Sequence, residues 1–258
     1  MISVQEIGGL KIACWVNQTG FDASKKTLVF IHGSGGDHTV WVHQYSQLQR
    51  DFNIAALNLP GHGQSEGGGE QEVALYAEWV EKILDQLAIR KPVLIGHSIG
   101  AAISLAFALK YRERLTGIVP VGGGATMPVN QAILDGLKVD PAAVIAMAAK
   151  IAVAKVNRER LTKILTESMS RVNPDVLYGD FLSCSKFNIT ETVSQINVPT
   201  LVICGDDDKM TPPAMSQLLK DNIPGAELSL IGHAGHFVML ENAEAFNRVL
   251  RDFVESLT

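Results

Sequence analysis

The sequence contains little cysteine, few aromatic residues and no cluster of positive charge. The chain has 258 residues, of which three are cysteines and 6% are aromatic, and its formal net charge is −5. Cys14, Cys184 and Cys204 are widely spaced and odd in number, which disfavours both a disulfide scaffold and a cysteine-based metal site. No run of lysine and arginine marks a surface for nucleic acid or anionic lipid. We therefore expect no metal and neither a nucleic-acid nor a membrane partner.

Long apolar segments are also missing. The longest candidate, residues 98–109, is shorter than the roughly 20 residues that a membrane-spanning helix needs. Residues 1–6 have neither the basic segment nor the apolar core of a secretory signal. We expect a cytoplasmic protein, either a monomer or a homodimer.

The first half of the chain alternates between short apolar runs and helical patterns. Thr27–Ile31, residues 53–59 and Gly117–Val121 are apolar almost throughout, as strands buried on both faces are. Residues 72–87 instead carry apolar side chains at helical spacing. This alternation predicts an α/β protein with a mainly parallel central sheet flanked by helices.

The pattern changes after residue 123. From residue 124 to residue 187 only helical patterns occur, over residues 141–156, 158–169 and 174–184. Apolar strand-like runs return at residues 199–203 and 227–231, and a final helix is expected at residues 243–257. We predict one core built from residues 1–123 and 188–258, interrupted by an all-helical insertion at 124–187.

The most informative segment is the sequence Gly96-His97-Ser98-Ile99-Gly100, which follows an apolar run and precedes a helix-like stretch. A sharp turn between a strand and a helix brings the two chains close together, and glycine at both flanks avoids a clash of Cβ atoms. Such a turn raises the serine hydroxyl above the sheet, where a substrate can reach it. The alternative is a chance match in a glycine-containing loop. We predict that Ser98 is a nucleophile.

A nucleophilic serine needs a base, and the base needs a carboxylate to orient it. Both residue types follow later strand-like runs, and the chain order is serine, aspartate, histidine. Two histidines and three consecutive aspartates compete for these roles: His233, His236, Asp206, Asp207 and Asp208.

Five ordered motifs resemble those of the α/β-hydrolase superfamily, in the branch of small serine esterases. They are His32-Gly33-Ser34-Gly35-Gly36, Pro60-Gly61-His62-Gly63-Gln64-Ser65, the Ser98 turn, Gly205-x-x-Asp208-x-x-x-Pro212, and Gly235-His236 followed by Glu241. The resemblance implies an α/β-hydrolase fold, with the helical insertion as the variable cap of that family.

The same resemblance implies roles for individual residues. Asp208 is expected to be the acid and His236 the base, which leaves Asp206 and Asp207 as caps or solvated groups and His233 as a structural hydrogen-bonding residue. The negative charge that develops on an attacked carbonyl needs backbone N–H donors. One is expected from Ile99 at the start of the helix, and the resemblance suggests Ser34 as the second. Three further histidines are expected to be structural: His97 should point away from the site, and His32 and His62 should hydrogen-bond within their loops.

Several apolar residues are candidates for an acyl pocket, although taken singly each fits an ordinary core position better: Met127, Met147, Ile151, Met210, Phe237 and Val238. We predict a serine hydrolase that cleaves small carboxylic esters through an acyl-enzyme without a cofactor. The alternatives are other reactions of the same triad, namely C–C bond, lactone or thioester hydrolysis and perhydrolysis. A further alternative is a ligand receptor or signalling protein that retains the triad.

Overall fold

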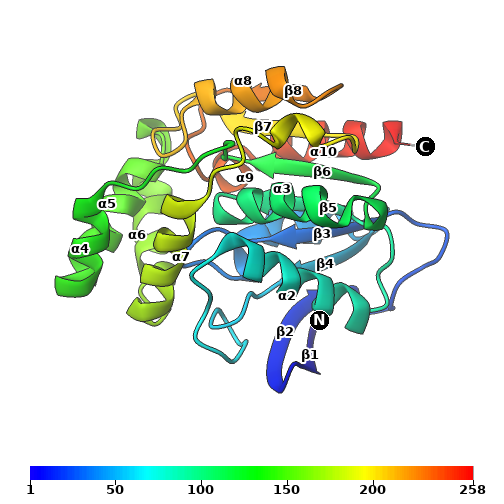
Figure 1. Ribbon diagram of the computed structural model, residues 1–258, viewed down its shortest axis with the longest axis horizontal. Coiled ribbons are helices and arrows are strands. Elements are labelled where there is room, and N and C mark those ends of the chain that lie inside the picture. Colours follow the sequence, from blue (N-terminus) through cyan, green and yellow to red (C-terminus); the bar gives the residue numbers. More distant parts are fainter. Residues whose placement is uncertain (258) are drawn as a thin grey trace.

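Eight strands form one sheet in the computed structural model, which describes residues 1–257 (Figure 1). The strand order is β1-β2-β4-β3-β5-β6-β7-β8. The bounds are β1 Ile2–Ile7, β2 Leu10–Val16, β3 Thr27–Ile31, β4 Asn53–Leu57, β5 Val93–His97, β6 Gly117–Val121, β7 Leu201–Gly205 and β8 Glu227–Ile231. Pairing is antiparallel between β1 and β2 and between β2 and β4, and parallel elsewhere. The predicted mainly parallel sheet is therefore confirmed.

Helices cover both faces of the sheet because successive strand residues point to opposite sides. Val29 packs on the face covered by α2 (Val73–Gln86), α3 (Ile99–Tyr111) and α8 (Pro213–Asn222). Its neighbour Phe30 packs on the other face, against α1 (Val42–Leu48), α9 (Val238–Glu241) and α10 (Ala243–Ser256). Every residue of the five strands β3 to β7 is wholly or largely buried, which explains their continuous apolar character.

Four helices lie between β6 and β7 and sit beyond the carboxyl ends of the parallel strands (Figure 1). They are α4 (Gln131–Val139), α5 (Pro141–Ala152), α6 (Arg158–Met169) and α7 (Pro174–Lys186). Asn130, Asp140 and Asn173 begin three of them, since each side chain accepts a hydrogen bond from an N–H of the first turn. We call residues 124–187 the cap. Its status as a separate domain stays a prediction.

The sequence patterns did not indicate every element. Strand β1 was not expected, because its burial is uneven and its pattern correspondingly weak. It pairs with β2 through a turn in which Gly8 and Gly9 both have positive φ. The helix expected over residues 141–156 ends at Ala152, and a short 3₁₀ turn, Lys155–Asn157, precedes α6.

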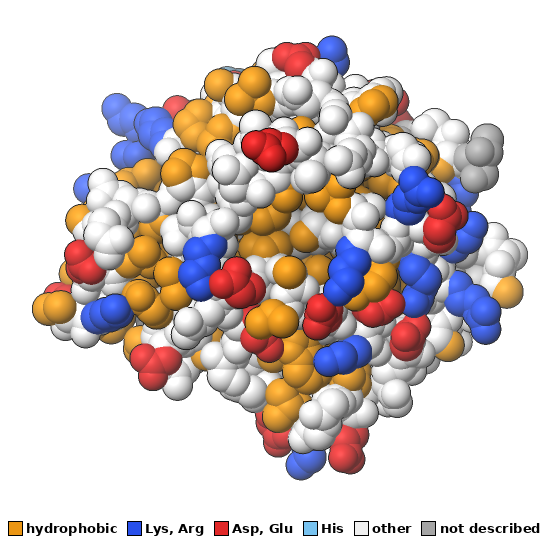
Figure 2. All heavy atoms as spheres, viewed as in Figure 1, with side chains coloured by type: hydrophobic (Ala, Val, Ile, Leu, Met, Phe, Trp, Pro, Cys, Tyr) orange, Lys and Arg blue, Asp and Glu red, His pale blue; other side chains and the backbone are white. Residues whose placement is uncertain are grey.

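Within residues 1–257, no helix combines the length and the apolar character that crossing a bilayer requires. Positive and negative side chains are intermixed on the face shown in Figure 2, and apolar side chains gather toward the cap side of that view.

Candidate active site

The turn that carries Ser98 has the strained geometry that its glycines predict. Ser98 lies between β5 and α3 with φ 56° and ψ −116°. A Cβ atom on Gly96 would lie 1.9 Å from the Gly100 carbonyl oxygen, and one on Gly100 would lie 2.5 Å from the Ile31 carbonyl oxygen. Only glycine fits at either position, so the strand and the helix can approach closely enough to present the serine at the apex.

Asp208 and His236 are buried and joined by a hydrogen bond. Asp208 follows β7 and His236 follows β8, and His236 Nδ1 lies 2.8 Å from Asp208 Oδ2. Asp208 Oδ2 also accepts from Thr211 Oγ1 at 2.9 Å, while Oδ1 accepts from the N–H groups of Met210 and Thr211 at 2.8 and 2.9 Å. Burial alone would raise the pKa of Asp208, but His236 and these hydrogen bonds outweigh it and lower the pKa. The carboxylate therefore stays ionised and accepts from Nδ1–H, which leaves Nε2 as the basic nitrogen.

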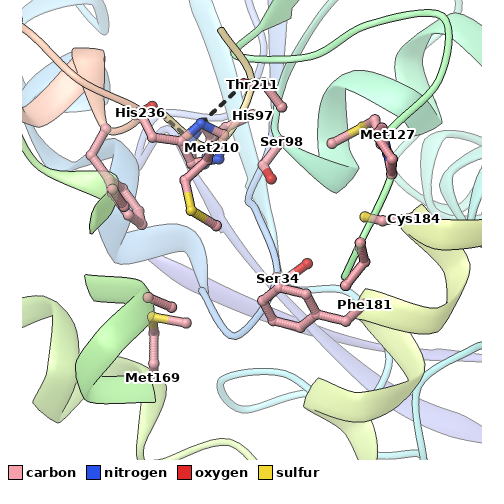
Figure 3. A pocket seen from close by; sticks show the side chains of 15 residues that line it. Ser34, His97, Ser98, Met127, Met169, Phe181, Cys184, Met210, Thr211 and His236 are labelled. Carbon is pink, nitrogen blue, oxygen red and sulfur yellow. Dashed lines mark hydrogen bonds between the residues drawn. The ribbon is translucent and has the colours of Figure 1, made fainter. Parts of the chain in front are cut away.

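Ser98 and His236 line the same cavity, which lies at the carboxyl ends of β5 and β8 (Figure 3). No hydrogen bond joins Ser98 Oγ to His236 among the described residues. Such bonds are often long in a free enzyme and tighten when substrate binds.

The competing acids and base lie elsewhere. Asp206 is exposed and accepts from the N–H of Ala234 at 3.3 Å, and Asp207 pairs with Lys209 at 3.5 Å. His233 is exposed, and its backbone carbonyl, not its ring, accepts from Asn157 at 2.8 Å. Of the five candidates, the structure brings together only Asp208 and His236.

The prediction that His97 points away from the site is wrong. His97 is the last residue of β5, and its side chain emerges on the face that the loop after β8 covers. Its ring centroid lies 4.6 Å from that of His236, and Nε2 lies 2.9 Å from the His236 carbonyl oxygen. Burial lowers the pKa of His97 well below its ordinary value, so the neutral ring donates from Nε2 and supports the backbone of His236.

Two backbone N–H groups are available near Ser98. Ile99 is the first residue of α3, and the first N–H groups of a helix have no partner within it. The N–H of Ser34, in the loop after β3, donates to no acceptor within residues 1–257. This loop contacts the nucleophile turn directly, since a Cβ atom on Gly33 would lie 3.1 Å from Ser98 Cβ.

The cavity has a volume of about 80 Å³ and is lined mostly by apolar side chains. Three of the six pocket candidates from the sequence, Met127, Met210 and Phe237, line it. The other three candidates do not. Met147 and Ile151 lie on the outer side of α5 and are 44% and 38% exposed, and Val238 is buried in the core between the sheet and α10.

The cap contributes wall residues that the sequence did not single out. Met169 of α6 and Phe181 and Cys184 of α7 line the cavity (Figure 3). Burial raises the pKa of the Cys184 thiol to about 12, so this side chain behaves as a small apolar group. The spacing of Phe181 and Cys184 along α7, and of Met169 with the other apolar residues of α6, indicates buried helix faces. The sequence does not show what these faces contact. Within residues 1–257, no group of three His, Cys, Asp or Glu side chains could hold a metal ion.

Comparison with known proteins identifies the family. The profile of the alpha/beta hydrolase family matches residues 28–249. The chain belongs to this family. The resemblance drawn from the motifs and the predicted α/β-hydrolase fold are thereby confirmed.

Within the alpha/beta hydrolase family, the chain is similar to proteins with different named activities. It is 29% identical over 285 residues to the 2-hydroxy-6-oxononadienedioate/2-hydroxy-6-oxononatrienedioate hydrolase of Paraburkholderia phymatum, covering 96% of this chain and 92% of the relative. Among solved structures, a thermophilic esterase is 31% identical with a TM-score of 0.86, covering 99% of this chain and 97% of that one. Est816, described as an N-acyl homoserine lactone degrading enzyme, is 26% identical with a TM-score of 0.86, covering 97% and 100%.

Proposed function

We propose that the protein is a serine hydrolase that cleaves small, uncharged carboxylic esters. The observation that carries the proposal is the placement of Ser98 and His236 in one apolar cavity, with Asp208 bonded to the far side of the imidazole. The similarity to the thermophilic esterase, over nearly the whole of both chains, supports it.

The reaction follows from these positions. His236 Nε2 takes the proton of Ser98 Oγ as this oxygen attacks the ester carbonyl, and the N–H groups of Ile99 and Ser34 stabilise the tetrahedral oxyanion. His236 then gives its proton to the departing alcohol, which leaves an acyl group on Ser98. A water molecule, deprotonated by the same nitrogen, attacks the acyl group. His236 then returns this proton to Ser98 Oγ as the bond between Oγ and the acyl carbon breaks, which releases the carboxylic acid.

The charge of the cavity wall favours an uncharged substrate. Among residues 1–257, no lysine or arginine lines the cavity, and none lines an adjoining cavity of about 370 Å³ between α6 and the loop after β3. A substrate carboxylate would lose its hydration there without gaining a cationic partner.

A second candidate function is C–C bond hydrolysis, because of the similarity to the Paraburkholderia phymatum enzyme. The substrate in that enzyme's name is a keto-dicarboxylate without an ester, so its hydrolysis must break a C–C bond. The missing lysine and arginine weigh against a dicarboxylate here. Lactone opening needs no such cation, since a lactone is a cyclic ester.

Turnover of p-nitrophenyl acetate and butyrate, combined with labelling by a fluorophosphonate, tests the proposal. We expect multiple turnovers, labelling at Ser98, and a fall in kcat/KM of about 10⁴- to 10⁶-fold in Ser98→Ala. The exposed Ser46 on α1 provides a matched control, and Ser46→Ala should hydrolyse both esters at the wild-type rate.

Three outcomes would contradict the proposal. Wild-type turnover in Ser98→Ala would exclude Ser98 as the nucleophile. Labelling without turnover would favour the receptor alternative. Hydrolysis of a 2-hydroxy-6-oxo-dienedioate with no ester turnover would favour the second candidate.

A further inference from the structure

The cap carries one fully buried carboxylate that the catalytic steps above do not use. The Asp180 side chain, on α7, has no solvent exposure. Its Oδ1 accepts from Tyr76 Oη at 2.6 Å, and its Oδ2 lies 2.8 Å from His62 Nε2 and accepts from the N–H of Gly35 at 3.2 Å. These partners come from α2, from the loop after β4 and from the loop after β3. One cap side chain therefore binds three separate segments of the core.

His62 adopts the charged form beside this carboxylate. Its Nδ1 lies 3.1 Å from the Pro60 carbonyl oxygen, and its Nε2 faces Asp180. Because both neighbours are acceptors, both ring nitrogens carry a proton. Burial lowers the pKa of His62, but Asp180 and the Pro60 carbonyl outweigh burial and raise it overall. The N–H of Gly35 therefore donates to the same Asp180 oxygen that pairs with the imidazole, and hydrogen bonds within such an ion pair are stronger than bonds between neutral groups.

Helix α7 faces the Ser34 loop with three side chains on one helical stripe, Leu177, Asp180 and Cys184. A Cβ atom on Gly35 would lie 2.9 Å from Leu177 Cδ1, so the helix packs directly against this loop. The Cys184 and Ser34 side chains line the same cavity.

The Gly35 N–H belongs to the peptide bond between Ser34 and Gly35. The preceding peptide bond, between Gly33 and Ser34, carries the Ser34 N–H, which in the proposed function stabilises the oxyanion. The Gly36 N–H donates to the Gly33 carbonyl at 3.0 Å and closes the loop from within. Gly35 has φ 67°. Because glycine has no side chain, its backbone can change conformation more easily than that of other residues, so Gly35 by itself does not hold the loop in place. Among the described residues, the bond to Asp180 is the only hydrogen bond between the backbone of residues 33–36 and a residue outside 32–36.

We propose that Asp180 is a positioning residue for ester hydrolysis: by holding the Gly35 N–H, it aims the Ser34 N–H at the oxyanion that forms on the acyl group of Ser98. This inference rests on the proposed function. A displacement of about 1 Å in a reacting group can cost about 100-fold in rate, so removal of this contact should lower kcat with little effect on KM.

Two isosteric variants and one control test the proposal. Asp180→Leu keeps the shape and removes the acceptor, and we expect kcat for p-nitrophenyl butyrate to fall about 100-fold with KM within about threefold of wild type. Asp180→Asn keeps an oxygen that can accept from Gly35 and His62, so kcat should fall only about 10-fold. The control Tyr76→Phe removes a bond to the other carboxylate oxygen and should leave kcat within about twofold.

Binding of an aryl trifluoromethyl ketone separates positioning from a general loss of structure. This inhibitor adds to Ser98 and forms an oxyanion, so its Ki should rise in each Asp180 variant by the same factor by which kcat falls. A Ki unchanged in a variant with reduced kcat would overturn the inference. Wild-type kcat in folded Asp180→Leu, or a loss carried by KM, would do the same.

If Asp180→Leu does not fold, Asp180→Asn decides alone. A tenfold fall in kcat with a matching rise in Ki supports the inference, and wild-type kcat overturns it. Failure of the proposed function is distinguishable, because wild-type protein would then show no ester turnover, and the inference would fall with it.

Discussion

The sheet core and the cap use apolar residues differently. The central strands are buried on both faces, and their side chains join two large clusters on the two sides of the sheet. Apart from Cys184 of α7, which joins one of these, the buried apolar residues of the cap helices form two small clusters. Val139, Val156 and Ile164 of the cap are between 58% and 86% exposed. The core therefore holds Ser98, Asp208 and His236 in the segments that follow β5, β7 and β8. The cap builds the cavity wall from helices, of which α5 and α6 bury one face and α7 is buried on most sides.

The cap is nevertheless bonded to two of the loops in the proposed site, those that carry His236 and Ser34. The carbonyl oxygen of Ala152, at the end of α5, accepts from the His236 N–H at 2.7 Å. Glu241, in α9, accepts from the N–H of Ala154 at 2.9 Å, and Asp180 accepts from Gly35. Cap and core thus differ in how they are built but share one site, with the chemistry supplied by the core and its alignment supported by the cap.

The largest expected effect lies in the core. Asp208→Asn keeps the shape of the side chain but no longer favours the tautomer with a proton on His236 Nδ1. We expect kcat/KM for p-nitrophenyl butyrate to fall about 10³- to 10⁴-fold. Asp207→Asn, in the neighbouring position, should remain near the wild-type rate, and a comparable loss in that variant would contradict the choice of Asp208.

A smaller effect is expected in the cap, on specificity. Phe181→Ala should enlarge the cavity without changing Ser98, Asp208 or His236. We expect the preference for p-nitrophenyl octanoate over p-nitrophenyl butyrate to rise about 10-fold. The kcat/KM ratio for the two esters measures this shift.

Val139→Ala, at an 86% exposed position on α4, is the matched control and should leave that ratio unchanged. An unchanged ratio in Phe181→Ala would mean that the cap wall does not set chain length.

The smallest expected effect concerns His62, which pairs with Asp180 where core and cap meet. It is a change in how the free energy of unfolding depends on pH. The pKa of His62 is raised in the folded protein, so its contribution to stability is complete below the unfolded value of about 6.5 and is lost as pH rises through the folded pKa. Urea unfolding of wild type and His62→Gln should therefore show a stability difference that is largest near pH 6 and shrinks toward pH 9.

Burial lowers the pKa of His32 and His97, which gives these residues the opposite pH dependence. Both residues are present in wild type and variant, but the His62 ring lies 4.7 Å from that of His32 and its charge also lowers the pKa of His32. The difference between wild type and variant therefore reports His62 together with its effect on His32. A difference that stays constant or grows with pH would contradict a charged His62.

The sharp turn at Ser98 could be predicted from sequence because most of its requirements lie within a few neighbouring residues. Gly96 and Gly100 lie within two residues of Ser98, and the clashes they avoid involve their own segment and the adjacent strand. The strand pattern was equally readable, since strands buried on both faces are apolar throughout. The residues alone left the acid and the base open, and the family resemblance pointed to Asp208 and His236.

Tertiary structure alone decided which residues meet across the boundary between core and cap. Asp180 is 118 residues from His62 and 145 from Gly35, so its helical spacing indicates that it lies on a buried face but not what that face contacts. The sequence likewise did not show that Phe181 lines the cavity or that Met147 lies outside it. A turn is determined by the conformations of a few neighbouring residues, whereas contacts between distant segments depend on how whole helices pack against the sheet.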